Sequence, residues 1–146
     1  MRRFVLCAAA MMMVWLGVAG VAQTKIATVE EYAAVMKSNA QSFPATNKAI
    51  ASGAYADAKT QLATVRGNFM ALQAFWTEKK QDGAVGIVKD GLTKIDALDK
   101  LLSAGTVDQM AAQAAAKEVQ GSCGACHKQY REGDNQTGFK FKAGVI

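Results

Sequence analysis

Three side chains capable of chemistry lie within five residues of one another in the segment GSCGACHKQYRE, which runs from Gly121 to Glu132. Cys123 and Cys126 supply two thiols, and His127, the only histidine of the chain, supplies an imidazole. A set of this kind can bind a structural zinc ion, act as a redox-active dithiol, or attach a haem covalently through the pattern Cys-x-x-Cys-His.

Composition weighs against the first two of these hypotheses. A structural zinc site needs four Cys or His ligands, but beyond residue 22 the chain has only Cys123, Cys126 and His127. A redox-active Cys-x-x-Cys normally opens a helix beside a βαβ sheet, where the helix dipole lowers the thiol pKa. Here the motif falls deep inside a predicted helix of an all-α chain. A helical protein with a thiol-redox or metal-binding function, and without haem, remains the alternative.

Covalent haem attachment requires that the three groups project from one side of their helix. Each thiol adds to a haem vinyl group, and the adjacent histidine binds the iron. Positions 123, 126 and 127 are related as i, i+3 and i+4, so they share one helical face. We therefore predict one haem c per chain, attached through Cys123 and Cys126, with His127 as an axial ligand of the iron.

Residues 1–22 have the three parts of a cleaved export signal. Arg2 and Arg3 precede an uncharged apolar run over 4–21, and the small-residue sequence GVA then suits cleavage before Gln23. An uncleaved membrane anchor is the alternative, because the run is nearly long enough to span a bilayer. We expect cleavage, location in the periplasm, and no membrane association of the mature chain.

The charge of the chain excludes one class of partner. The full sequence has a formal net charge of +5, and without the two arginines of the signal 15 basic residues face 12 acidic ones, a net charge of +3. Since these basic residues are scattered rather than clustered, we expect no nucleic-acid binding.

Four amphipathic helices are predicted to position the motif, over residues 28–53, 54–80, 84–104 and 106–133. The pattern Thr-x-x-Glu predicts a capping box at Thr28, and a similar pattern predicts a second helix start at Thr106. Pro44 is expected to kink the first helix without ending it. The short turns favour an antiparallel up-down-up-down bundle. This domain covers 23–133, and the tail over 134–146 is expected to be extended or poorly ordered.

Apolar spacing predicts which faces of the helices turn inward. The second helix has the clearest stripe, formed by Leu62, Val65, Phe69, Leu72 and Trp76. The stripe of the first helix is predicted to contain Val29, Tyr32, Met36 and Phe43. The stripe of the fourth is predicted to contain Val107, Met110, Ala114, Val119, Cys123, Cys126 and Tyr130. Glycines at 86 and 91 are expected to weaken the third helix.

The chain resembles the class II c-type cytochromes, the cytochrome c′ and cytochrome c-556 family, in its length, its predicted export, its four alanine-rich helices and its late segment CGACHKQYR. The resemblance covers the predicted domain but not the tail. It implies an antiparallel four-helix bundle with haem on the last helix. It further implies redox partner proteins, and homodimers are common among such proteins.

The resemblance leaves two designs open for the second side of the iron. In one design the iron is five-coordinate and binds NO or CO. In the other, a methionine of the first helix completes a six-coordinate, low-spin centre, and Met36 in YAAVMKSNA resembles that ligand. We predict the second design and a one-electron carrier that transforms no substrate, with Met70 and Met110 in the core. The alternative for Met36 is core packing.

Arg131 closes the family motif one turn after His127. The resemblance implies that its guanidinium approaches a haem propionate or the exposed haem edge. The alternative is a solvated cation that interacts favourably with the C-terminal end of the helix dipole.

Overall fold

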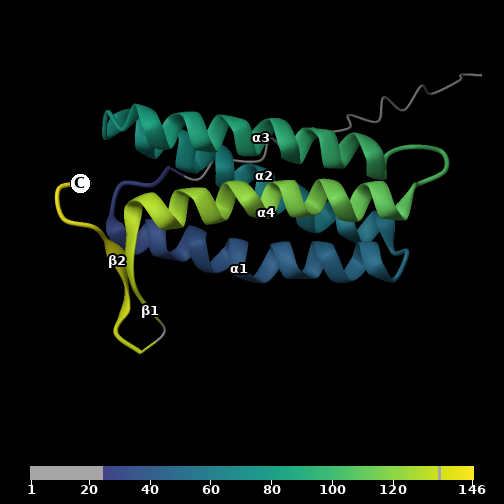
Figure 1. Cartoon of the computed structure of the whole chain (residues 1–146), viewed down its shortest axis with the longest axis horizontal. Helices are drawn as coiled ribbons and strands as arrows, with labels where there is room; N and C mark the ends of the chain where they lie inside the picture. Colours follow the sequence, from purple (N-terminus) through teal and green to yellow (C-terminus); the bar gives the residue numbers. More distant parts are fainter. Residues whose placement is uncertain (1–24, 135) are drawn as a thin grey trace, which may run out of the picture.

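The computed structural model describes residues 25–134 and 136–146 (Figure 1). The predicted export signal lies outside the described residues. The described chain forms four helices followed by a two-stranded antiparallel sheet: α1 (Val29–Ala51), α2 (Tyr55–Glu78), α3 (Asp82–Leu102), α4 (Gln109–Tyr130), β1 (Arg131–Asp134) and β2 (Gly138–Phe141). No helix among these residues is long and apolar enough to cross a membrane.

Successive helices run antiparallel and lie side by side, which confirms the predicted all-α up-down-up-down bundle (Figure 1). α1 packs on α2, α2 on α3, and α3 on α4. α4 returns beside α1, but this pair makes the least extensive contact of the four. The end of α4 and the start of α1 therefore lie at the same end of the bundle, where the β-hairpin projects.

The first helix start agrees with its predicted capping box. Thr28 Oγ1 accepts a hydrogen bond from Glu31 N at 3.2 Å, and Glu31 Oε2 accepts one from Thr28 N at 3.0 Å. α1 then continues through Pro44. The predicted start of the fourth helix at Thr106 is wrong. Asp108 is the N-cap, and its Oδ1 accepts a hydrogen bond from Ala111 N at 3.0 Å. Its negative charge also interacts favourably with the positive end of the helix dipole.

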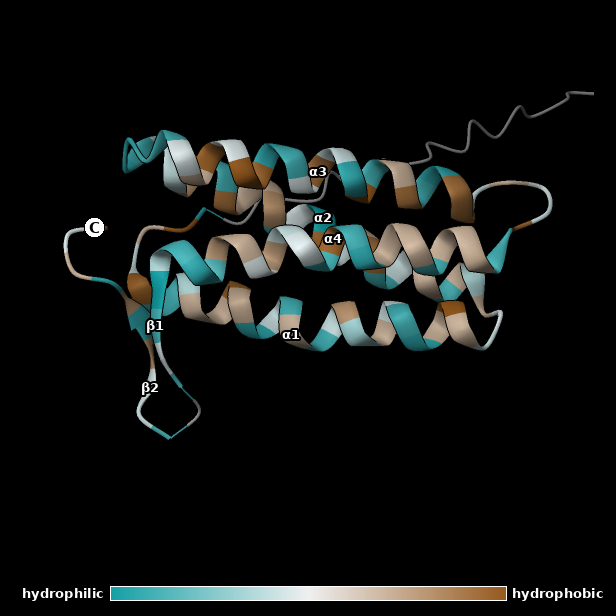
Figure 2. Cartoon of the chain, in the orientation of Figure 1, coloured by the Kyte–Doolittle hydropathy of each residue, from teal (hydrophilic) through white to brown (hydrophobic). Residues whose placement is uncertain are grey.

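The core agrees with the predicted stripe of α2, whose five members are all at least 95% buried. Trp76, Ile95 and Leu98 are fully buried. Figure 2 shows brown and teal segments alternating along the helices, as amphipathic helices require.

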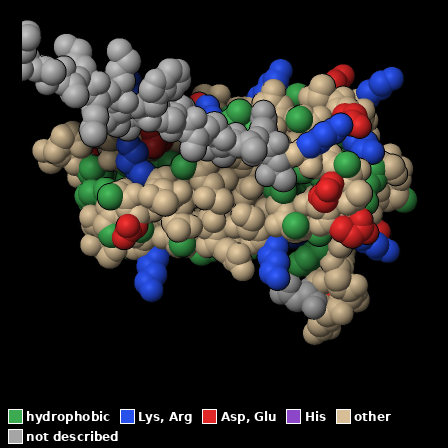
Figure 3. Space-filling model, turned by 180° about the vertical axis from the view of Figure 1, so that it is seen from behind, with side chains coloured by type: hydrophobic (Ala, Val, Ile, Leu, Met, Phe, Trp, Pro, Cys, Tyr) green, Lys and Arg blue, Asp and Glu red, His purple; other side chains and the backbone are tan. Residues whose placement is uncertain are grey.

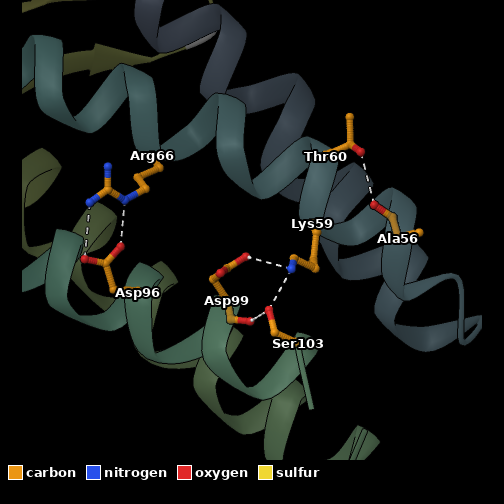
Figure 4. Close-up of polar contacts among 7 residues, drawn as sticks. All are labelled: Ala56, Lys59, Thr60, Arg66, Asp96, Asp99 and Ser103. Carbon is orange, nitrogen blue, oxygen red and sulfur yellow. Dashed lines mark hydrogen bonds and ion pairs between the residues drawn. The ribbon is translucent and has the colours of Figure 1, made fainter. Parts of the chain in front are cut away.

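On the outer side of α2 and α3, Arg66 pairs with Asp96 at 2.7 Å (Figure 4). On the face seen in Figure 3, basic and acidic side chains are interspersed.

Three predictions about buried faces are wrong. Val29 is 49% exposed, Met110 is 81% exposed, and Ala114 is exposed. The buried face of α4 is formed by Ala112, Ala116, Val119, Ser122, Cys126 and Tyr130. This stripe follows helical spacing and begins at two alanines, Ala112 and Ala116, so it leaves Met110 on the outside of the first turn.

Gly91 has a packing function that its low helix propensity conceals. A Cβ atom at this position would lie 2.4 Å from Cε1 of Phe69. The absence of a side chain on α3 therefore lets the Phe69 ring of α2 approach closely. The prediction that Gly91 only weakens the helix was incomplete, because the residue also allows two helices to pack.

The tail begins earlier than predicted and forms a hairpin. The predicted boundary between 133 and 134 falls inside β1, because pairing with β2 begins at Arg131, opposite Phe141. α4 accordingly ends at Tyr130 rather than Gly133. Gly133 has φ 86°, and a Cβ atom there would lie 2.0 Å from the carbonyl oxygen of Gly138, so this position requires glycine.

Candidate functional site

The last two turns of α4 carry the three motif side chains. Cys126 is buried, whereas Cys123 and His127 are half-buried. Ser122, which precedes the motif, is also buried and fixes α4 on α3. Its hydroxyl donates to Asp90 Oδ2 at 3.0 Å and accepts from Lys94 Nζ at 3.3 Å. Asp90 and Lys94 form an ion pair at 2.7 Å, so a polar cluster holds this part of α4 in position.

The two thiols lie in an environment that does not activate them. Neither Cys123 nor Cys126 forms a disulfide in the described part of the chain. Burial raises the pKa of Cys123, and burial together with the neighbouring Cys123 raises the pKa of Cys126 to about 11. Redox-active dithiols have lowered thiol pKa values. Burial therefore shifts both thiol pKa values away from the direction that a redox-active dithiol requires.

The arrangement of the donors also differs from a metal cage. Among the described residues, no group of three or more His, Cys, Asp or Glu side chains is placed to hold one metal ion. The two cysteines and His127 are instead spread along one helix face. A haem offers two vinyl groups and an iron at separate points, which matches two thiols and one imidazole in number and chemistry. Burial also lowers the pKa of His127, which favours the neutral, metal-binding imidazole. The residues present thus fit a covalently attached haem.

The three methionines of the described chain lie in different environments. Met36 lies on α1, half-buried, and packs against the core cluster that includes Cys126. Met70 lies on α2 outside the core cluster, contrary to its prediction, and its sulfur accepts a hydrogen bond from Arg66 Nη1 at 3.1 Å. Met110 is exposed near the start of α4, at the end away from the motif. Met36 is the only one of the three that packs against the core cluster.

Arg131 lies beside the motif rather than free in solvent. It is half-buried at the start of β1, and its guanidinium lies 4.0 Å from the centroid of the Phe139 ring. Burial is the main cause that lowers the pKa of His127, and the charge of Arg131 lowers it further. The same charge opposes the increase in the pKa of Cys126. The predicted position near the haem site is therefore compatible with the structure.

An aromatic cluster closes the bundle beside the motif, and sequence reasoning identified only part of it. Its members come from α1, α2, α4 and β2, and they are Tyr32, Phe75, Trp76, Tyr130 and Phe141. Tyr32, Trp76 and Tyr130 were expected on inward faces of their helices, but Phe141 was not. The sequence feature that could have identified Phe141 is the alternation Phe-Lys-Phe-Lys over 139–142, which is typical of a strand with one inward face.

Trp76 adds an unusual polar group to this cluster. Its side chain is fully buried, and Nε1 makes no hydrogen bond of good geometry among the described residues, although the neighbouring Tyr32 hydroxyl is close enough that Trp76 opposes the rise in the pKa of Tyr32 caused by burial. The ring is surrounded by Tyr32 at 5.7 Å, Tyr130 at 5.3 Å and Phe141 at 5.5 Å between centroids. An unpaired buried N–H group is costly. Haem carries carboxylate groups that can accept such a bond, so the orphaned donor also fits the presence of haem.

Comparison with known proteins gave one match. Residues 8–131 match the family model described as Cytochrome C′, a segment that includes Met36 and the complete Cys-x-x-Cys-His motif. The match ends at Arg131, so almost all of the β-hairpin lies beyond it. No curated protein and no solved structure matched the chain.

Proposed function

The chain belongs to the cytochrome c′ family, and from this membership we propose that it is an exported, periplasmic one-electron carrier with one haem c. The family is one of haem-binding c-type cytochromes, and α4 carries its attachment motif. Haem supplies a reversible one-electron couple at its iron when bound. We propose that redox proteins are its partners and that it transforms no substrate.

Three side chains of α4 would hold the cofactor. Cys123 and Cys126 would form the two thioether bonds, and His127 would bind the iron. The ion-paired cluster around Ser122 keeps this part of α4 fixed on α3. A fixed helix limits movement of the ligands between oxidation states, which favours rapid electron transfer.

Met36 is the best candidate for the second axial ligand. His127 is the only histidine, so a second histidine of this chain cannot fill the position. Met36 packs against the core from α1, whereas Met70 is bonded to Arg66 and Met110 is exposed. A thioether is a soft ligand that favours ferrous iron and raises the reduction potential. The iron would then be six-coordinate and low-spin.

Arg131 and Trp76 are candidates for binding the haem carboxylates. Arg131 brings a positive charge beside the motif, and Trp76 brings a buried N–H group that needs an acceptor. A charged acceptor strengthens such a bond. The two side chains would thereby orient the ring and stabilise ionised propionates.

Optical spectra of the haem-loaded protein test the ligand assignment. We expect low-spin spectra in both oxidation states, and slow CO binding that requires displacement of Met36. Met36→Leu should convert the iron to high spin and let ferrous haem bind CO directly. Met70→Leu is the matched control and should leave the spectra unchanged. A wild-type protein with high-spin bands and direct CO binding would instead be a five-coordinate protein that binds CO or NO.

A further inference from the structure

The β-hairpin is fastened to the bundle by contacts beyond its own pairing. Lys142 N donates to Tyr130 O at 3.0 Å, and Lys142 Nζ donates to Lys128 O at 2.7 Å. Near the end of the chain, Val145 O accepts from Gln81 Nε2 at 2.8 Å. These bonds hold the returning strand and the residues after it against α4 and the turn between α2 and α3.

Phe141 extends this attachment to the first two helices. Its ring lies 4.7 Å from that of Tyr32 on α1, 5.5 Å from that of Trp76 and 6.3 Å from that of Phe75 on α2. Since β1 continues directly from α4, the hairpin joins the end of α4 to α1 and α2. Figure 1 shows the hairpin running from the end of α4 past the start of α1 and projecting beyond it, at the end of the bundle where the motif lies.

The α1–α4 side needs such a connection more than the others do. α1 and α4 make the least extensive helix contact of the bundle, yet the proposed ligands Met36 and His127 lie on these two helices. Tyr32 precedes Met36 by four residues, so the two side chains lie on the same face of α1. A ring that fixes Tyr32 therefore also fixes the turn of α1 that carries Met36.

We propose that the β-hairpin is a strap that sets the spacing of α1 and α4 at the haem site, with Phe141 as a positioning residue for Met36. This inference rests on the proposed ligation of the iron by Met36. The strap lies almost entirely outside the segment that matches the family, so the family match alone does not imply this role.

A comparison of two phenylalanines on β2 tests the proposal in the full-length, haem-loaded protein. Phe141 packs inward, whereas Phe139 is 50% exposed and lies over Arg131. Phe141→Ala should raise the rate at which CO replaces the methionine on ferrous haem by about tenfold, which corresponds to about 1.4 kcal/mol. It should also add a high-spin fraction to the ferric spectrum. Phe139→Ala should change neither.

Two further variants keep the test decisive. If Phe141→Ala fails to fold, Phe141→Leu and Gln81→Ala loosen the strap by smaller amounts, and both should raise the CO rate in the same direction. Unchanged rates and spectra in every strap variant that folds, with lowered thermal stability, would overturn the positioning role. A wild-type spectrum that is already high-spin would overturn the ligation by Met36. A low-spin wild type with insensitive strap variants would overturn the strap alone.

Discussion

The α2–α3 side and the α1–α4 side of the bundle are built differently. Between α2 and α3, Phe69 lies directly against Gly91, and Arg66 and Asp96 form an ion pair over the packed seam. Between α1 and α4, direct packing is sparse, and an aromatic cluster with a hairpin holds the end. The α2–α3 side is thus held by direct helix packing along its length. The α1–α4 side is held chiefly at the end that carries the attachment motif, and the proposed ligands Met36 and His127 lie on its two helices.

Removal of the attachment groups should have the largest effect on this comparison. In a Cys123→Ala, Cys126→Ala double variant we expect no covalent haem adduct in the mass spectrum. Amide hydrogen exchange should then rise more in α1 and α4 than in α2 and α3, because the helices that carry the proposed ligands would lose the haem between them. Gly124→Ala is the control, since a Cβ atom there meets nothing within 4 Å and the motif spacing is kept. A covalent adduct in the double variant would contradict the assignment.

A second variant disrupts the α2–α3 side. Gly91→Ala improves helix propensity but places a methyl group 2.4 Å from Phe69. Overpacking of this kind costs more than the propensity gains, so we expect the free energy of unfolding to fall by about 1–2 kcal/mol. Gly86→Ala, with no atom near its added Cβ, should instead raise it by up to about 1 kcal/mol. Equal effects in denaturant titrations would refute close packing at Gly91.

Trp76→Phe tests the polar part of the haem-bearing side. The indole N–H should stabilise an ionised propionate and so keep its pKa low. Without it, the fall of the reduction potential with rising pH should move to higher pH by about one unit. Phe75→Leu is the control for lost aromatic packing. A pH dependence of the potential that is identical in wild type and Trp76→Phe would show that the N–H has another partner.

The smallest effect is expected at the exposed ion pair of Figure 4. Arg66 and Asp96 are about half exposed, and such pairs contribute less than about 1 kcal/mol. A double-mutant cycle with Arg66→Gln and Asp96→Asn should give a small coupling energy that decreases with added salt. A coupling that is large and independent of salt would mean that the α2–α3 side depends on charge rather than on packing.

The sequence predicted those features that follow from regular spacing. The stripe from Leu62 to Trp76 is buried as expected, and the motif lies on one face of the last helix, because helical periodicity alone determines both. The phase of the α4 stripe was harder to predict. Ala112 is buried and Met110 is exposed, although both side chains are apolar, so hydropathy alone does not determine which face of α4 packs inward.

The hairpin and its role escaped prediction for another reason. Each strand has four residues, and only one ring of the pair, Phe141, packs into the core, so the local signal is weak. The partners of that ring are Tyr32 and Trp76, which are distant in sequence and come together only when the bundle forms. The packing function of Gly91 escaped prediction for the same reason, because the residue that excludes a side chain there, Phe69, belongs to another helix.

The position of Trp76 has a practical consequence. The chain has two tryptophans, and the other one lies within the first 22 residues, so the mature protein would contain a single indole. In the haem-loaded protein a nearby haem would quench this indole, so its fluorescence would rise when the closed end opens, while circular dichroism averages over all four helices. Unfolding followed by both signals would therefore reveal whether that end opens as a separate step before the helices melt.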